Sequence, residues 1–210
     1  MVIYYPNKKN ITSYINKNNT FTKKNIMNLN KNLGNRGMSL ENEINKSNEF
    51  YLLNDIAVIH KKPTPIQIVN VDYTRRSKTI IKEAYFRQPS TTDYNGVYNG
   101  FYIDFDAKET KNKSSFPLHN FHEHQIIHMK KCLKQKGICF AIIKFTIKNK
   151  LFLLPAKYLI QQWDNQYSGG RKSIPIQEII INGYEIKYSL NPIIPYLNIV
   201  NKLITDNKEG

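Results

Sequence analysis

Two carboxylates and one amine stand at a spacing that suits metal-assisted hydrolysis of a phosphate ester. The segment 101–108 alternates in polarity, and side chains two residues apart in a β-strand point to the same face. Asp106 and Lys108 would therefore lie side by side on the polar face of this strand. Asp93 precedes them across a short turn, so a hairpin would bring its carboxylate opposite Asp106. Two converging carboxylates make a hard oxygen site for Mg²⁺.

The chemistry gives each of these three residues a role. A divalent cation on Asp93 and Asp106 would lower the pKa of its bound water and hold the scissile phosphate. Lys108 would orient or deprotonate that water, or neutralise charge in the transition state. An acid–x–Lys segment is also common on solvated strands with ion pairs, so the motif alone leaves both interpretations open. The partner acid Asp93 and the basic composition favour the catalytic interpretation.

The surrounding sequence predicts the elements that position these residues. Ser39 can cap a helix that runs to about Leu52, and Gly96 and Gly100 would bracket the hairpin that carries Asp93. The order of elements predicts an α/β fold, in which a mixed central β-sheet is flanked by helices. We expect strands at 56–60, 66–71, 79–86, 91–95, 101–108, 139–145 and 151–154, and further helices at 118–136, 155–166 and 192–204.

The composition predicts a polyanionic partner. The 210 residues contain 31 Lys and Arg against 16 Asp and Glu, a formal net charge of +15. Codon bias in an AT-rich genome would also enrich lysine, so the charge is partial support. We find no apolar run of bilayer-spanning or signal-peptide length, and the two cysteines, Cys132 and Cys139, fit no zinc or redox motif. These features favour nucleic acid over a membrane surface, and a cytoplasmic location.

Composition predicts three segments along the chain. Residues 1–34 contain no acid and no apolar periodicity, which predicts a disordered basic N-terminal arm. A passive extension and an arm that follows DNA phosphates remain equally good interpretations of it. We expect one domain over 35–205 and a disordered tail at 206–210.

Several longer motifs add a family resemblance. In chain order they are Asn35–Glu41 (NRGMSLE), Ala57–Pro65 (AVIHKKPTP), Lys82–Phe86 (KEAYF), Ser90–Gly96 (STTDYNG), Ala107–Lys113 (AKETKNK), Phe116–Leu118 (FPL), Asn120–His122 (NFH) and Gly170–Ser173 (GRKS). Together they resemble the RecU-type Holliday junction resolvases over about 35–200. The resemblance implies a restriction-endonuclease-like core with a protruding β-hairpin stalk at about 61–86.

The resemblance also implies the composition of the active site. Asp93 and Asp106 would bind Mg²⁺, with Mn²⁺ as a possible substitute, and Lys108 would be the catalytic lysine. Thr91 and Gln125 would complete the metal site, and Glu41 resembles a catalytic helix glutamate of related resolvases. At Asp106 the chain differs from a known family member, which has glutamate there, although the nuclease superfamily accepts either acid. Aspartate is one methylene shorter, which bears on metal distance and metal preference.

The partners implied by the resemblance are a four-way DNA junction, a second copy of the chain, a recombinase and a branch-migration helicase. A homodimer suits a four-way junction because two symmetric nicks need two matched active sites. The activity implied is an endodeoxyribonuclease that acts in DNA recombination and DNA repair. The residues expected to bind DNA are Arg75, Arg76 and Lys78 at the stalk tip, together with Arg36, Lys111, Lys113, Arg171 and Lys172.

Three alternatives differ in what they require of the sequence. A junction-binding or strand-annealing accessory protein with little nuclease activity would have no need of Asp93, Asp106 and Lys108. A restriction-type endonuclease would need base-reading elements, which we do not identify. A zinc helix is suggested by the i, i+4 spacing of His124 and His128, but a zincin would have glutamate where this chain has Gln125.

Overall fold

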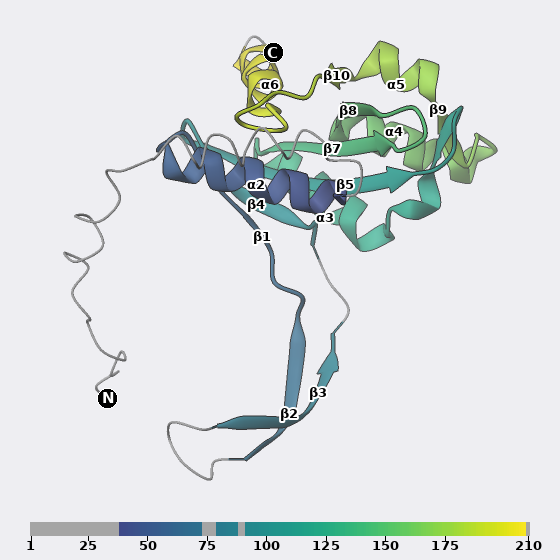
Figure 1. Cartoon of the computed structure of the whole chain (residues 1–210). Helices are drawn as coiled ribbons and strands as arrows, with labels where there is room; N and C mark the ends of the chain where they lie inside the picture. The colour runs from purple at the N-terminus through teal and green to yellow at the C-terminus, as the bar shows by residue number, and fades with distance from the viewer. Residues whose placement is uncertain (1–37, 73–78, 88–90, 209–210) are drawn as a thin grey trace. The chain divides into compact units, whose positions relative to one another are not determined.

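A six-stranded mixed sheet forms the centre of the fold (Figure 1). The computed structural model describes residues 38–72, 79–87 and 91–208, with side chains up to residue 205. The strand order is β1–β4–β5–β7–β8–β10, in which β5 and β7 are parallel and the other neighbours antiparallel. The strands are β1 (Val58–Lys61), β4 (Tyr94–Tyr98), β5 (Phe101–Thr110), β7 (Ile138–Phe145), β8 (Lys150–Pro155) and β10 (Tyr184–Ile186).

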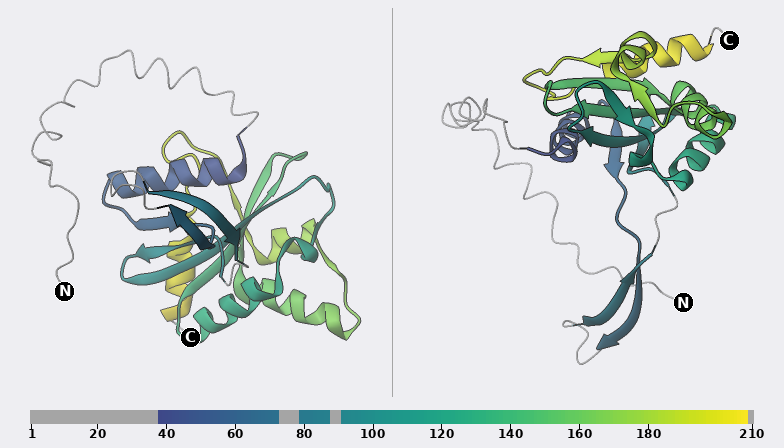
Figure 2. Two further views of the ribbon diagram at one scale, coloured as in Figure 1. Left: turned by 90° about the horizontal axis from the view of Figure 1, so that it is seen from below. Right: turned by 90° about the vertical axis from the view of Figure 1, so that its right-hand side faces the viewer.

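Helices cover both faces of this sheet, as Figure 2 shows. One buried cluster joins α2 and α6 to one face, and a second cluster joins α3, α4 and α5 to the other. The sequence prediction of a mixed sheet flanked by helices is confirmed, and the architecture is restriction-endonuclease-like. The helices are α2 (Leu40–Leu53), α3 (Glu123–Lys134), α4 (Ala156–Asn165), α5 (Ile176–Asn182) and α6 (Leu197–Lys208).

The alternation in β5 decides which face receives the polar residues. Ile103, Phe105 and Ala107 belong to the cluster under α2 and α6. The Phe105 ring stacks between the rings of Tyr94 and Phe140, with centroids 4.8 Å from each. Because these side chains hold one face of the strand in the core, the intervening polar residues of β5 face the α3 side.

The turn between β4 and β5 differs from the expected one. Asn99 and Gly100 have φ values of 49° and 79°, so they form the turn themselves, as in the tight turns that favour Asn-Gly. Gly96 lies within β4, not at the turn. A Cβ atom on Gly96 would lie 2.6 Å from the Ile59 Cα of β1, so the close approach of the two strands requires glycine here.

A separate two-stranded sheet occupies the region expected to form a stalk. Strands β2 (Ile66–Asp72) and β3 (Ile80–Phe86) pair antiparallel, and every residue of β3 is exposed. Several large apolar side chains are exposed on this hairpin, among them Ile68, Ile81 and Phe86. The expected tip residues Arg75, Arg76 and Lys78 lie outside the described residues, as do Arg36 and the whole 1–34 arm.

Two predicted helices start later than the sequence suggested. A 3₁₀ turn occupies Leu118–Asn120, and α3 begins only at Glu123. His122 and Gln125 form a reciprocal capping box that starts α3 afresh. Helix α6 begins at Leu197, because Pro195 disfavours helical geometry in the residue before it. Its other end extends to Lys208, so 206–208 are helical although we expected 206–210 to be a disordered tail.

Four short elements were not predicted. They are the helix α5, the edge strand β10, and the strands β6 (Ser115–Pro117) and β9 (Ser173–Pro175), which pair with each other. Within the described residues, no helix is both long enough and apolar enough to cross a membrane.

Candidate active site

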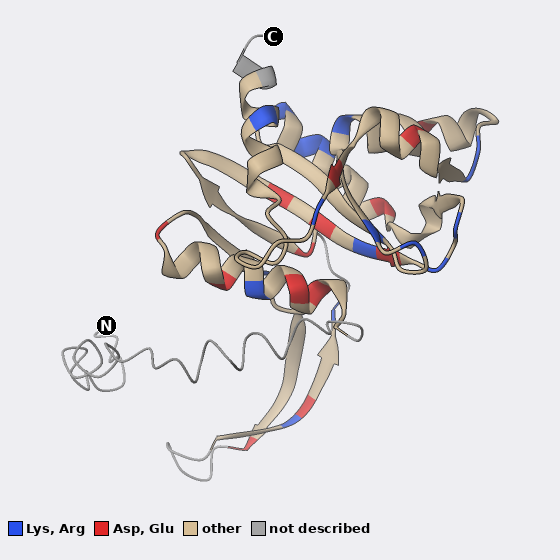
Figure 3. Ribbon diagram, turned by 45° about the horizontal axis from the view of Figure 1, so that its top comes forward, with Lys and Arg blue, Asp and Glu red and all other residues tan. Residues whose placement is uncertain are grey.

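Pairing of β4 with β5 brings Asp93 to Asp106. Tyr94 is the register partner of Phe105, and Asp93 directly precedes Tyr94, so the next step of the register places Asp93 opposite Asp106. Lys108 follows on the same face of β5. Figure 3 shows acidic positions followed by a basic one along the central strand. The three residues predicted from spacing are therefore brought together by the fold.

Lys108 connects the two carboxylates. Its Nζ lies 3.0 Å from Asp106 Oδ1 and donates a hydrogen bond of 3.4 Å to Asp93 Oδ2. The Lys108 ammonium also lies 5.9 Å from the centre of the Phe121 ring. Asp106 is fully buried, whereas the Asp93 side chain keeps 31% of its exposure. The site is thus closed on the sheet side and open on the Asp93 side.

The shared environment separates the titration of the two acids. Burial and the neighbouring Asp93 raise the pKa of Asp106 well above its usual range. Burial also acts to raise the pKa of Asp93, but interactions with Asp106 and Lys108 outweigh it and lower that pKa. Burial lowers the pKa of Lys108, and the two carboxylates more than compensate, so the pKa of Lys108 is raised. At neutral pH the lysine is charged, and the carboxyl pair holds a proton more readily than two isolated acids.

The donor set fits a divalent cation. Among the residues that the structure describes, neither carboxylate oxygen of Asp106 has a hydrogen-bond partner of suitable geometry, although both are buried. Buried carboxylate oxygens without hydrogen bonds are costly unless a cation or a proton compensates them. Carboxylate oxygens from adjacent strands are ligands that Mg²⁺ and Mn²⁺ favour. Asp93 and Asp106 are the residues that would hold such an ion.

Glu41 lies at the rim of the site. The first turn of α2 is fixed by Ser39, whose side chain accepts a hydrogen bond from Asn42 N, and by Glu109, whose Oε1 accepts one of 3.0 Å from Leu40 N. Glu41 forms an ion pair with Lys61, and the Lys61 charge in turn lowers the pKa of Asp93. Glu41 is therefore connected to the carboxyl pair indirectly, through its ion pair with Lys61.

Thr91 and Gln125 are engaged locally. The Gln125 Oε1 accepts a hydrogen bond of 3.0 Å from His122 N, as part of the capping box of α3. The Thr91 hydroxyl donates a hydrogen bond of 3.3 Å to Thr92 O. Gln125 is buried on the same side of the sheet as Asp106. Metal ligation by either residue stays a prediction, and it would require these local hydrogen bonds to be exchanged.

The sequence spacing placed a second acid, Asp104, on the polar face of β5 but assigned it no role. Asp104 precedes Asp106 on the same face of β5 and is fully buried. Its Oδ2 accepts hydrogen bonds of 2.9 Å from Lys62 Nζ and from Tyr102 Oη, and its Oδ1 accepts one from Thr92 Oγ1. The spacing of β5 indicated that Asp104 shares a face with Asp106. The partners Lys62 and Thr92 come from distant segments and carried no signal.

The helix histidines have two different surroundings. His128 Nε2 lies 3.1 Å from Asp104 Oδ2 and 3.4 Å from Cys132 Sγ. Potential ligand atoms of Asp104, His128 and Cys132 fall within 4.8 Å of one another. Because Asp104 already accepts bonds from Lys62 and other donors, this cluster is a hydrogen-bond network. The His124 ring instead stacks on the His122 ring. Burial lowers the pKa of His124, and the neighbouring His122 and the charge of Lys108 lower it further.

The expected DNA-binding residues that the structure describes gather around one small sheet. Lys111 and Lys113 precede β6, and Arg171 and Lys172 precede β9, the strand that pairs with β6. Lys172 O accepts a hydrogen bond of 3.0 Å from Leu118 N, which joins the two segments. All four side chains are exposed.

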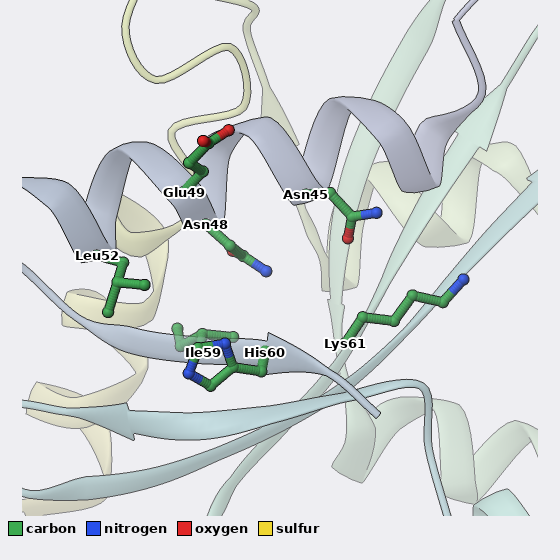
Figure 4. Close-up of a pocket in the computed structure, with 7 residues that line it drawn as sticks. All are labelled: Asn45, Asn48, Glu49, Leu52, Ile59, His60 and Lys61. Carbon is green, nitrogen blue, oxygen red and sulfur yellow. The ribbon is translucent and has the colours of Figure 1, made fainter. Parts of the chain in front are cut away.

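A shallow pocket of about 210 Å³ lies between α2 and β1 (Figure 4). Asn45, Asn48 and Glu49 of α2 line one side, and Ile59, His60 and Lys61 of β1 line the other. The carboxyl pair is not among its lining residues, so the candidate active site is a separate feature.

The fold and this arrangement of acid, then acid–x–Lys, define the restriction-endonuclease-like class of nucleases. Comparison with known proteins narrows the class. The model of the family described as "Recombination protein U" matches residues 35–202. The chain belongs to this RecU family.

The relatives cover nearly the same length. A protein named Holliday junction resolvase RecU from Latilactobacillus sakei subsp. sakei strain 23K is 63% identical over 177 residues, 84% of each chain. Its namesake from Limosilactobacillus reuteri strain DSM 20016 is 59% identical over 204 residues, which is 97% of this chain and 98% of the relative. That from Lactiplantibacillus plantarum is 62% identical over 177 residues, or 84% and 86%.

Proposed function

We propose that this chain is a Mg²⁺-dependent endonuclease that resolves Holliday junctions by paired symmetric nicks during recombination and repair. The observation that carries the proposal is the convergence of Asp93 and Asp106 beside the Lys108 ammonium, together with the lack of well-oriented hydrogen bonds to the buried Asp106 oxygens within the described residues. The names of the relatives support the junction as substrate. A protein that only bound or annealed DNA would gain nothing from this costly arrangement.

In the proposed mechanism, Asp93 and Asp106 would hold the metal ion, which when bound would supply an acidic water and a positive charge for the scissile phosphate. Lys108 Nζ, which already lies against both carboxylates, adds a fixed positive charge where the phosphate gains negative charge in the transition state. Hydrolysis leaves a 5′-phosphate and a 3′-hydroxyl, ends that a ligase can join.

Junction selection in this proposal rests on shape and phosphate contacts. The exposed cations around β6 and β9 and the exposed β2–β3 hairpin would contact the DNA without reading base edges. A homodimer would place two such sites on opposite sides of the two-fold axis of the junction, so that the nicks fall at symmetric positions. A recombinase and a branch-migration helicase are the further partners we propose.

The proposal is tested with a synthetic four-way junction in which each strand is labelled in turn. With Mg²⁺ or Mn²⁺ present, we expect nicks at symmetric positions in two opposing strands, products that ligase seals, and no cleavage of a linear duplex of the same sequence. Tight junction binding with no nicks in either metal would contradict the proposal. That result would favour the accessory-protein alternative.

A further inference from the structure

The base of the β2–β3 hairpin is tied to the candidate active site by three side chains. Lys62 directly follows β1 on the way into the hairpin, and Thr92 lies on the way out, one residue before Asp93. Lys62 Nζ donates hydrogen bonds of 2.9 Å to both Thr92 Oγ1 and Asp104 Oδ2. Thr92 Oγ1 donates to Asp104 Oδ1. We call Lys62, Thr92 and Asp104 the hairpin-base clasp.

The clasp also includes the backbone of Asp93. Lys61 is the register partner of Tyr94, and the backbone pairing continues with a hydrogen bond of 2.8 Å from Lys62 N to Asp93 O. Lys62 therefore contacts Asp93 through its main chain and Thr92 through its side chain. Asp93 lies between this anchor and the first residue of β4.

Burial makes the clasp rigid. Asp104 and Thr92 are 0% and 2% exposed, and the Lys62 side chain keeps 19%. Tyr102 Oη also donates to Asp104 Oδ2, and His128 Nε2 lies 3.1 Å from that oxygen, so the carboxylate is held from β5 and α3 as well. A buried carboxylate with hydrogen bonds to both oxygens fixes the groups around it, because a displacement breaks these bonds.

We propose that Thr92, Lys62 and Asp104 are positioning residues that hold Asp93 against Asp106 and thereby set the affinity of the site for its divalent cation. Asp93 directly precedes β4, and the backbone at the end of a strand frays readily when nothing anchors it. The clasp removes that freedom from the residue that must meet Asp106. This inference rests on the proposed function for the location of the metal site, and it adds residues that do not themselves touch the ion or the DNA.

The test measures metal binding on the full chain without DNA. Mn²⁺ is titrated into metal-free protein, and the free ion is followed by its electron paramagnetic resonance signal. Thr92→Val keeps the shape of the side chain and removes its hydrogen bonds, whereas Thr92→Ser keeps the hydroxyl. We expect the Kd for Mn²⁺ to rise about tenfold or more in Thr92→Val, the usual cost of removing a supporting hydrogen bond at a metal site. Thr92→Ser should stay close to the wild type.

A purely structural role would give a different pattern. In that case Thr92→Val would lower the thermal midpoint, but the folded fraction would bind Mn²⁺ with the affinity of the wild type, and this result would overturn the proposal. Equal losses in the Val and Ser variants would also overturn it. If Thr92→Val does not fold, Lys62→Met replaces it, because that variant removes the ammonium and keeps the backbone bond to Asp93. The same increase in Kd is expected there.

The outcome can be separated from that of the proposed function. A wild-type chain that resolves junctions while Thr92→Val binds Mn²⁺ unchanged would contradict the clasp alone. A chain whose Mn²⁺ affinity depends on Thr92 but that leaves junctions uncut would contradict the proposed function alone. A wild-type chain that binds no Mn²⁺ would contradict both.

Discussion

The Lys108 ammonium lies 3.0 Å from the buried Asp106 carboxylate, and both side chains project from the same face of β5. Because Asp106 and Lys108 are two residues apart on one strand, the lysine cation lies beside a candidate metal ligand. The strand is held by its opposite face, where Phe105 stacks between Tyr94 and Phe140. The geometry of the pair is therefore set by the core and not by a mobile loop.

Replacing Lys108 with methionine should slow junction cleavage while leaving junction binding nearly unchanged. The methionine keeps the stem but removes the charge that would meet the transition state, and a lost donor of this kind lowers kcat by about a hundred- to a thousandfold. Single-turnover cleavage rates measure the effect. Lys130→Met is the matched control, since Lys130 pairs with the exposed Asp164 on the surface. A Lys108→Met variant that cuts at the wild-type rate would remove the lysine from the mechanism.

Metal affinity should depend on pH in a defined direction. The pKa of Asp106 is raised by burial and by Asp93, so in the metal-free protein this acid keeps its proton to a higher pH than usual. A metal ion must displace that proton, and affinity therefore weakens as pH falls through the raised pKa, by up to about tenfold per pH unit. Calorimetric titrations in buffers with different ionisation enthalpies would detect proton release on binding. If the affinity for the metal ion did not change as the pH was lowered, and no proton was released on binding, the raised pKa of Asp106 would be contradicted.

Gly96→Ala should destabilise the sheet that carries Asp93. The added Cβ would lie 2.6 Å from the Ile59 Cα of β1, so the backbones of β1 and β4 would have to separate. Overpacking of this kind lowers the free energy of unfolding by about 1–3 kcal/mol. Urea unfolding measures it, and Val97→Ala, at an exposed position of the same strand, is the control. Equal stability of the two variants would show that the strands separate at no cost.

Removing charge near β9 should weaken junction binding in a salt-dependent way. Each phosphate contact contributes about 0.9 to the slope of log K against log salt concentration. An Arg171→Gln, Lys172→Gln double variant should therefore bind junctions more weakly at low salt and show a shallower slope. Lys202→Gln, on α6 above the Tyr184 ring, is the control. An unchanged slope in the double variant would place DNA elsewhere on the chain.

The sequence predicted those parts of the structure that depend on local pattern. The alternation of 101–108 predicted β5 and its polar face, and the largely apolar segment 139–145, in which only Lys144 is polar, predicted the fully buried β7. The short strands β6, β9 and β10 were missed because three residues carry too little periodicity, and their existence depends on pairing with distant partners.

For the site, spacing predicted that Asp93, Asp106 and Lys108 would come together, and it could not predict Asp104 as a hub. The role of Asp104 depends on Lys62 and Thr92, which only the fold brings to it. The start of α3 was also predicted at the wrong residue. The capping box of His122 and Gln125 is not a standard Ser or Thr motif, so the helix was expected to begin at Leu118.

The most direct test of the central claim compares the wild-type chain with Asp106→Asn on a labelled four-way junction in Mg²⁺. A metal ion supplies several kcal/mol of transition-state stabilisation, so loss of this ligand should slow cleavage by about a hundredfold or more. Junction binding without metal should persist. Cleavage by Asp106→Asn at the wild-type rate would contradict the assignment of the active site to this carboxyl pair.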